Sequence, residues 1–438
     1  MGLRQFIFGS IFISLLVLLN YFTDRRDFIQ LIACFAILFA IYLYWIKESN
    51  KQDFNYLLAI AIAARIALIF STPNLSDDYF RFIWDGKLIA NGINPFDYLP
   101  NELRESIFYQ SNLLLINGMN SPEYYSIYPP ALQFIFFISS YLSFGNISAN
   151  LVLLKIFILV FESGTIFLLI NLLKHFHLPK TRIFLYALNP LILTELSGNI
   201  HFEAGMIFFM LLTLYLILQN KLFLAAISFT IAVSIKLIPL LFLPAIFFYL
   251  KTKKGFIFSF STLILIIISS LPFFYNWEQL FHFFTSFQLY FQKFEFNASL
   301  YYVFRYIGIK LTGYNQIAII GKILPFIVMI SALVFALKRN KNSIQLPIKL
   351  FWTLSIYLLF ASIVHPWYLC PLIAFSVFTN YRFIILLSGL SVVSYFAYSS
   401  NLYTENYYLI AIEYSLAGIY FMYELMKNKK PNYLPVVR

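Results

Sequence analysis

Two adjacent aspartates, Asp77 and Asp78, follow a long apolar segment in a chain of which only 11% of the residues are charged. Aromatic side chains occupy several of the next positions, and Gly92 and Pro95 then mark turns. This loop is therefore predicted to have a defined conformation. A carboxylate held beside a membrane can act as a general base towards a hydroxyl group. A collar of interfacial aromatic residues with solvated acids is the alternative interpretation.

A second polar stretch, Ser197–Glu203, connects two apolar segments. It carries His201 and Glu203 two positions apart, and Glu195 shortly precedes it. A histidine and a carboxylate at this spacing can position a sugar or the hydroxyl group that accepts it. A short polar connector between two spans is the alternative.

Three charged residues, Lys155, Glu162 and Lys236, fall within or between apolar segments. A charge at the centre of a bilayer costs about 2.5–3.5 kcal/mol on insertion scales, so each needs a partner or a polar cavity. Lys155 and Glu162 lie seven positions apart on one face of the same segment and are predicted to form a structural pair. Lys236 is either a functional cation or a side chain that reaches the outer interface.

The composition places these residues in a membrane protein. Hydrophobic residues make up 61% of the 438, against about 45–50% in soluble domains. The net charge of +12 would suggest nucleic acid in a soluble protein, but here the basic residues form short clusters between apolar runs, as in cytoplasmic loops. No nucleic-acid partner is therefore expected. Cys34 and Cys370 lie inside apolar segments and give neither a disulfide framework nor a metal-ligand spacing.

The apolar segments predict an all-α fold, a polytopic membrane bundle of about 12–14 transmembrane helices in one domain over residues 1–438. A span requires about 20 mostly apolar residues. Fourteen segments are candidates, several of them short: 5–22, 28–46, 55–71, 150–173, 181–197, 203–219, 222–235, 236–250, 256–274, 318–337, 347–364, 366–380, 382–398 and 407–426. Those within residues 1–54 form an additional N-terminal helical hairpin.

Five basic clusters set the expected orientation, because cytoplasmic loops are rich in lysine and arginine. They lie at 47–51, 174–182, 251–254, 338–341 and 427–430. All five lie on one face only if residues 128–144 form an interfacial juxtamembrane helix and do not cross the bilayer. The alternative is a crossing there, with one other span miscounted. Arg25 and Arg26 are the exception to this pattern.

With this topology both termini are cytoplasmic, and the polar loops share the outer face. These loops are 72–149, 198–202 and 275–317, together with the turn at His365. The outer loop 72–149, which carries juxtamembrane helices, is the candidate catalytic loop, and 275–317 is a second outer loop.

The spacing in the catalytic loop resembles that of a known superfamily. Asp78 is followed after four residues by Phe82, after fourteen by Gly92, and then by Pro95-Phe96. This order resembles polyprenol-phosphate-mannose-dependent mannosyltransferases and the catalytic subunit of the first mannosyltransferase of GPI-anchor synthesis. Both belong to the GT-C superfamily of integral-membrane glycosyltransferases. Ser76 stands where the GPI enzymes have the first Asp of an Asp-x-Asp-Tyr motif, so the resemblance selects Asp78 and gives no support for a metal.

The resemblance implies Asp78 as the catalytic base and Lys236 as the group that binds the phosphate of a lipid donor. The stretch around His201 is similar to the Gly-x-x-His-x-Asp/Glu element of these enzymes, Lys236 with Pro239 to their Lys-x-x-Pro element, and His365 begins a similar His-Pro-x-Tyr-like turn. The residues expected to bind substrate are Asp77, Arg81, Tyr128, His201, Glu203, Lys236, Arg305 and His365.

The predicted function is therefore transfer of a sugar, by resemblance mannose, from a polyprenyl-phosphate donor to a lipid or glycan acceptor. The reaction is an inverting single displacement at the outer face of a bacterial inner membrane. Its partners are the donor, the acceptor and membrane lipid; no cofactor or metal is expected, and no protein partner is indicated. The alternative is a transporter or flippase for a polyprenyl-linked sugar or lipid. In that case Lys155 and Glu162 would be central and Asp78 dispensable.

Overall fold

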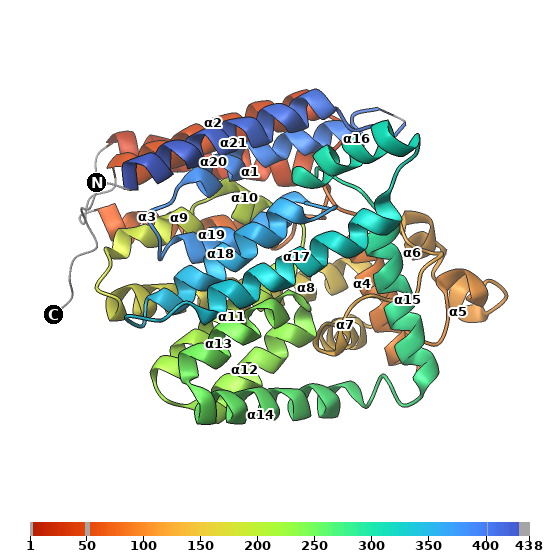
Figure 1. Ribbon diagram of the computed structural model, residues 1–438. Helices are drawn as coiled ribbons and strands as arrows, with labels where there is room; N and C mark the ends of the chain where they lie inside the picture. The colour runs from red at the N-terminus through yellow and green to blue at the C-terminus, as the bar shows by residue number, and fades with distance from the viewer. Residues whose placement is uncertain (1–2, 49–52, 401, 429–438) are drawn as a thin grey trace.

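The computed structural model describes residues 3–48, 53–400 and 402–428, and helices dominate this part of the chain (Figure 1). No strand occurs within the described ranges, where one isolated bridge joins Phe296 to Ile363. The prediction of an all-α polytopic helical bundle is confirmed.

Six helices among the described residues are long and apolar enough to cross a membrane, or seven when one bent pair is counted as a span. The six are α1 (Leu3–Phe22), α2 (Phe28–Glu48), α8 (Ile147–His175), α14 (Thr252–Ser270), α17 (Ile317–Leu337) and α21 (Tyr407–Asn428). Shorter apolar helices accompany them: α3 (Phe54–Ala67), α7 (Pro130–Leu142), α12 (Leu222–Ile235), η5 (Ile238–Phe242) with α13 (Leu243–Leu250), α18 (Gln345–Phe360), and α20 (Phe383–Leu390) with η7 (Ser391–Tyr398).

Two of the fourteen expected spans, 181–197 and 366–380, are not continuous helices, and that prediction is wrong. The first consists of η3 (Lys180–Ile183), α9 (Phe184–Ala187), α10 (Pro190–Ile192) and the π-helix η4 (Leu193–Gly198); the second begins with η6 (Pro366–Leu369) and α19 (Cys370–Ser376). Proline lacks a backbone N–H and ends a preceding helix, which accounts for the break before Pro190. Such irregular backbone is tolerated at membrane depth only when protein surrounds it, and every residue from 183 to 207 is buried.

The bent pair that includes this region contains the second polar stretch. Residues Pro190–Gly198 meet α11 (Glu203–Leu218) at 111°, and His201 lies in the break between them. The bend therefore turns the polar connector into a fixed corner inside the bundle.

The candidate catalytic loop contains four helices and one 3-10 turn. They are α4 (Asp78–Ala90), η2 (Pro100–Leu103), α5 (Ile107–Gln110), α6 (Leu113–Gly118) and α7. The helices α4 and α7 touch closely at Gly86, where an added Cβ atom would lie 2.1 Å from the carbonyl oxygen of Phe136. Phe82 stacks on the Phe136 ring at 4.7 Å. At 13 residues, α7 is shorter than the roughly 17–25 that a span needs, and its position at the outer interface stays a prediction.

The second outer loop packs against the first. It contains α15 (Trp277–Lys293) and α16 (Leu300–Thr312), and α15 contacts residues of the loop that follows α4, where the rings of Phe96 and Phe283 lie 5.9 Å apart. Gln279 donates a hydrogen bond to Asp97 at 2.8 Å, and the rings of His282 and Tyr125 stack at 3.8 Å. The two loops therefore contact each other, although 182 positions in sequence separate Gln279 from Asp97.

The charges inside the bundle have different partners from those expected. Glu162 pairs with Arg65 of α3 at 2.7 Å and also accepts a hydrogen bond from Tyr186. Lys155 donates to the carbonyl oxygens of Leu68 and Gly198 at 2.8 and 2.9 Å, and to the Ser71 hydroxyl. The predicted Lys155–Glu162 pair is therefore wrong. At about 1.5 Å per residue, seven positions put their backbones about 10 Å apart, and nearer groups from α3, from the residues after it and from η4 reach the two side chains first.

Candidate functional site

Several of the predicted residues meet in one cluster, which we call the acid–lysine cluster. It comprises Asp78 at the first position of α4, Glu203 at the first position of α11, Lys236 directly after α12, and the turn from His365 to Tyr368. Asn120, in the loop after α6, completes it through a 3.5 Å contact from its amide nitrogen to Asp78. Segments that lie up to 290 residues apart thus form one site.

Asp78 is partly exposed, and its carboxylate lies close enough to several charges for them to change its pKa. Loss of water contact raises the pKa of Asp78 to about 6. The positive charge of Lys236 opposes this rise, while the negative charges of Glu203 and Asp77 add to it. A carboxyl group with a pKa near neutrality is suited to general base catalysis.

Lys236 forms the positive centre of the acid–lysine cluster. Its ammonium group makes an ion pair with Glu203 and lies 4.8 Å from the centre of the Tyr368 ring. The residue has extended backbone angles at the end of α12, so the helix stops and the side chain turns towards α11. A compact ammonium group in this position can bind an anionic oxygen such as that of a phosphate.

Four stacked rings form one wall of the site. Phe296 lies 4.5 Å from His365, His365 lies 4.2 Å from Trp367, and Trp367 lies 3.8 Å from His201. The isolated bridge at Phe296 fixes this order, since it ties the second outer loop to the strand-like residues before His365. Burial and the charge of Lys236 lower the pKa of His365 to about 3, so its ring is neutral at working pH.

The corner before α11 holds a second acid that was not among the predicted site residues. Glu195 lies in the π-helix, and one of its oxygens accepts a hydrogen bond from Tyr395 at 2.8 Å. The other oxygen lies 3.5 Å from Nε2 of His201, and neither atom has a hydrogen-bond partner among the described residues. Ile200 has a positive φ of 60°, which is strained for a β-branched residue. π-helices and strained backbone are frequent at functional sites.

The remaining predicted residues lie around this cluster or away from it. Asp77 makes an ion pair with Arg25 at 2.5 Å. Tyr128 contacts the rings of Phe82 and Phe136 beneath α4. The structure does not bring Arg81 and Arg305 to the cluster, and their role in binding substrate stays a prediction.

The two arginines have partners of their own. Arg81 is buried and pairs with Asp85 at 2.7 Å, and it also donates to carbonyl oxygens of the loop at 121 and 124. Arg305 pairs with Glu295 at 3.1 Å and donates to the hydroxyl of Tyr407. Arg81 thus stabilises the candidate catalytic loop from within, whereas Arg305 joins the second outer loop to the start of α21.

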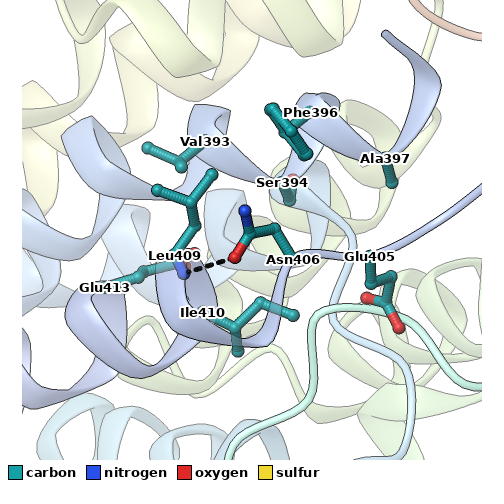
Figure 2. Close-up of a pocket in the computed structure, with 9 residues that line it drawn as sticks. All are labelled: Val393, Ser394, Phe396, Ala397, Glu405, Asn406, Leu409, Ile410 and Glu413. Atoms are coloured by element: carbon teal, nitrogen blue, oxygen red, sulfur yellow. Dashed lines mark hydrogen bonds between the residues drawn. The ribbon is translucent and has the colours of Figure 1, made fainter. Parts of the chain in front are cut away.

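Two hollows lie outside the cluster. One is a cavity of about 10 Å³ between η7 and the start of α21, lined by Ser394, Glu405 and Glu413 among others (Figure 2), which is room for about one water molecule. The other is an open cleft of about 580 Å³ between α4, α5 and α7, with Lys87 and Asn112 on its wall. No group of three or more His, Cys, Asp or Glu side chains within the described residues is arranged to hold a metal ion.

A polytopic helical bundle that gathers a carboxylate, a lysine and neutral histidines where its helices end has the architecture of a GT-C glycosyltransferase. Residues 15–252 match the model of the MptA_B family, alpha-(1->6)-mannopyranosyltransferase, N-terminal domain, and the chain belongs to this family. It is therefore a membrane-embedded mannosyltransferase that acts on a sugar donor and an acceptor. Comparison with curated proteins gives no match. The closer resemblance to the GPI enzyme stays a prediction.

Proposed function

We propose that this mannosyltransferase takes mannose from a polyprenyl-phosphate donor and transfers it, with inversion, to a hydroxyl acceptor at the outer face of the membrane. The observation that carries the proposal is the acid–lysine cluster, in which a partly exposed carboxylate with a raised pKa lies within the electrostatic influence of an ammonium group that is paired with Glu203. These are the two charges that a transfer from a sugar phosphate to an alcohol requires.

Each group has a defined role in this reaction. Asp78 takes the proton of the acceptor hydroxyl as its oxygen attacks C1 of the mannose. The bond between C1 and the phosphate oxygen breaks, and its electron pair stays on the departing lipid phosphate. Lys236 stabilises that charge, and Glu203, its ion-pair partner, keeps the ammonium group in position. The neutral ring of His365 is available to donate a hydrogen bond to donor or sugar.

The proposal that the donor is lipid-linked rests on where the cluster lies. It forms at the ends of α11 and α12 and beside the broken span, within a bundle whose outer helices expose apolar side chains. A prenyl chain can stay in the bilayer while its phosphate reaches Lys236. The placement of the bilayer is itself predicted from the basic clusters, of which residues 49–51 and 429–430 lie outside the described residues.

The family description supports a particular acceptor. An alpha-(1->6) linkage is formed by the primary hydroxyl at C6 of a mannose residue. A primary hydroxyl is the least hindered one of the sugar, and a base such as Asp78 would activate it. We therefore expect an acceptor that ends in mannose.

The experiment supplies purified protein in nanodiscs with radiolabelled polyprenyl-phosphate mannose or a nucleotide-linked mannose, together with mannose-terminated acceptors. Transfer is expected from the lipid donor only. Asp78→Asn should lower kcat by about 10²–10⁴-fold, because it removes the general base. Asp97→Asn is the matched control: the same change in the same loop, at a residue whose carboxylate contacts Gln279 and not the cluster.

Undiminished transfer by Asp78→Asn would contradict the catalytic role of Asp78. Transfer from the nucleotide-linked donor alone would contradict the lipid donor. Movement of a lipid-linked sugar across the bilayer without any transfer would instead support the transporter.

A further inference from the structure

The turn between α1 and α2 contains the two arginines that do not fit the charge pattern of the loops. Arg26 is exposed. Arg25 makes an ion pair with Asp77 at 2.5 Å, and its guanidinium group lies 4.9 Å from the centre of the Tyr398 ring. The N-terminal hairpin therefore places a positive charge beside Asp77, the residue that precedes the proposed base Asp78.

Hydrogen bonds fix this turn against the start of the catalytic loop. The side-chain amide of Asn74 donates to the carbonyl oxygens of Leu19, at 3.0 Å, and of Thr23. Asn199, next to the buried corner, accepts hydrogen bonds from the backbone N–H groups of Asn74 and Leu75 at 3.2 and 3.0 Å. The turn, the catalytic loop and the corner before α11 are thus one connected structure.

The Asp77 side chain does not cap the helix that it precedes. It occupies the N-cap of α4, where an aspartate ordinarily accepts a hydrogen bond from the first turn and contributes about 1 kcal/mol. Its side chain makes no such bond and contacts Arg25 instead. The N-cap hydrogen bond would stabilise α4 locally, but the carboxylate makes the ion pair with Arg25 instead. The contact with Arg25 therefore determines the position of this carboxylate.

We propose that Arg25 is a positioning residue of the transferase site: it binds Asp77, fixes the first turn of α4, and cancels a negative charge that would otherwise stand beside Asp78. This inference rests on the proposed role of Asp78 as the base. The N-terminal hairpin is then part of the active site and not an appendage to it.

The charges that face Asp78 set the direction of the effect. Lys236 from the end of α12 favours the ionised carboxylate, whereas Glu203 from α11 and Asp77 disfavour it; Tyr398 of η7 faces it as a neutral phenol. When Arg25 is removed, the charge of Asp77 is no longer compensated, and the pKa of Asp78 must rise. The base is then protonated over a wider range of acidic pH.

The first test compares the pH dependence of kcat for four variants with that of the wild type. Arg25→Met should move the acidic limb up by about one pH unit and so lower the rate about tenfold at pH 5, with little loss on the alkaline plateau. Arg25→Lys should restore most of the profile. Arg25→Met with Asp77→Asn should return the limb to its wild-type position, because no charge remains at position 77. Arg26→Met, the same change in the same turn, should leave the profile unchanged.

An acidic limb that stays in place in Arg25→Met, or one that moves equally in Arg26→Met, would overturn the proposal. So would a double variant that keeps the shift of Arg25→Met.

The second test needs no activity. The effects of Arg25→Met and Asp77→Asn on the melting temperature should be non-additive, since the two side chains contact each other, whereas Arg26→Met and Asp77→Asn should be additive. Additive effects for the first pair would overturn the proposal. If no polyprenyl donor supports transfer but the first pair remains coupled, the proposed function has failed and the role of Arg25 in positioning the catalytic loop stands.

Discussion

The interior of the bundle and the acid–lysine cluster both contain buried charged groups, but these groups differ in how many of their polar atoms have a hydrogen-bond partner. Every nitrogen of the Arg65 guanidinium has a partner, in Glu162 or in the carbonyl oxygens of Ala61 and Ala187. Lys155 uses three hydrogen bonds. In and beside the cluster, atoms of Glu195, His201 and His365 have no hydrogen-bond partner among the described residues.

The Arg65–Glu162 pair and Lys155 differ in this respect from the groups in and beside the cluster, although Arg81, outside the cluster, also has one guanidinium nitrogen without a partner among the described residues. A buried polar atom without a partner costs about 1–3 kcal/mol, so a stable protein retains such atoms where a ligand or a reaction needs them. The charged groups of Arg65, Lys155 and Glu162 already have protein partners and have no free donor or acceptor for a ligand among the described residues. A transport pathway through Lys155 and Glu162 would require the opposite arrangement, with free groups inside the bundle and saturated ones at its end.

The largest effect is expected in the interior. Arg65→Met leaves Glu162 buried without its cation and should destabilise the protein by about 3–5 kcal/mol. Unfolding in mixed detergent, followed by tryptophan fluorescence, measures that change. The molecules that remain folded should transfer mannose at the wild-type rate. A variant that melts normally but has lost transfer would place Arg65 in the reaction and remove the contrast between the two regions.

The same substitution at two lysines tests the comparison directly. Lys236→Met removes the cation proposed for the donor phosphate, and the KM for the donor should rise about 10–100-fold, as expected for a charge-assisted hydrogen bond of about 1.5–3 kcal/mol. Lys155→Met leaves the carbonyl oxygens of Leu68 and Gly198 unpaired, so it should lower the melting temperature and leave the KM unchanged.

Equal KM values in the two lysine variants would show that Lys236 does not bind the donor. A Lys155→Met protein that keeps its melting temperature would instead show that the interior hydrogen bonds contribute no stability.

The sequence was sufficient for the class of fold and for much of the cluster. Hydropathy predicts the bundle because about 20 consecutive apolar residues most often form a transmembrane helix. Asp78, His201, Glu203, Lys236 and His365 were all singled out from residue type, spacing and the resemblance to GT-C enzymes, and the structure brings them together. Charged and aromatic residues at the ends of apolar segments are conspicuous when only 11% of the chain is charged. Their roles stay predictions until transfer is measured.

The sequence was insufficient where a contact depends on distant segments. Arg65 reaches Glu162 from 97 positions earlier, and no local pattern reveals it. The ring of Phe296 joins the stack through a backbone bridge between the second outer loop and the residues before His365. Arg25 was conspicuous only as an exception to the charge pattern. The break at Pro190 was hidden because residues 181–197 are apolar enough to be interpreted as one span, whereas the turn before Pro366 was predicted.

The smallest effect is the pH dependence of the wild-type enzyme, and it separates the groups within the cluster. Asp78, with a pKa raised to about 6, is protonated below that pH, whereas His365, with a pKa lowered to about 3, stays neutral throughout. The initial rate, measured with saturating donor, should therefore fall about tenfold for each pH unit below 6 and level off above it. Lys236→Met should move the limb to higher pH, because the charge of Lys236 favours the ionised carboxylate. Lys155→Met should leave it in place, since Lys155 makes its contacts inside the bundle. A profile that stays flat from pH 5 to 7 would contradict Asp78 as the base and leave the cluster as a binding site alone.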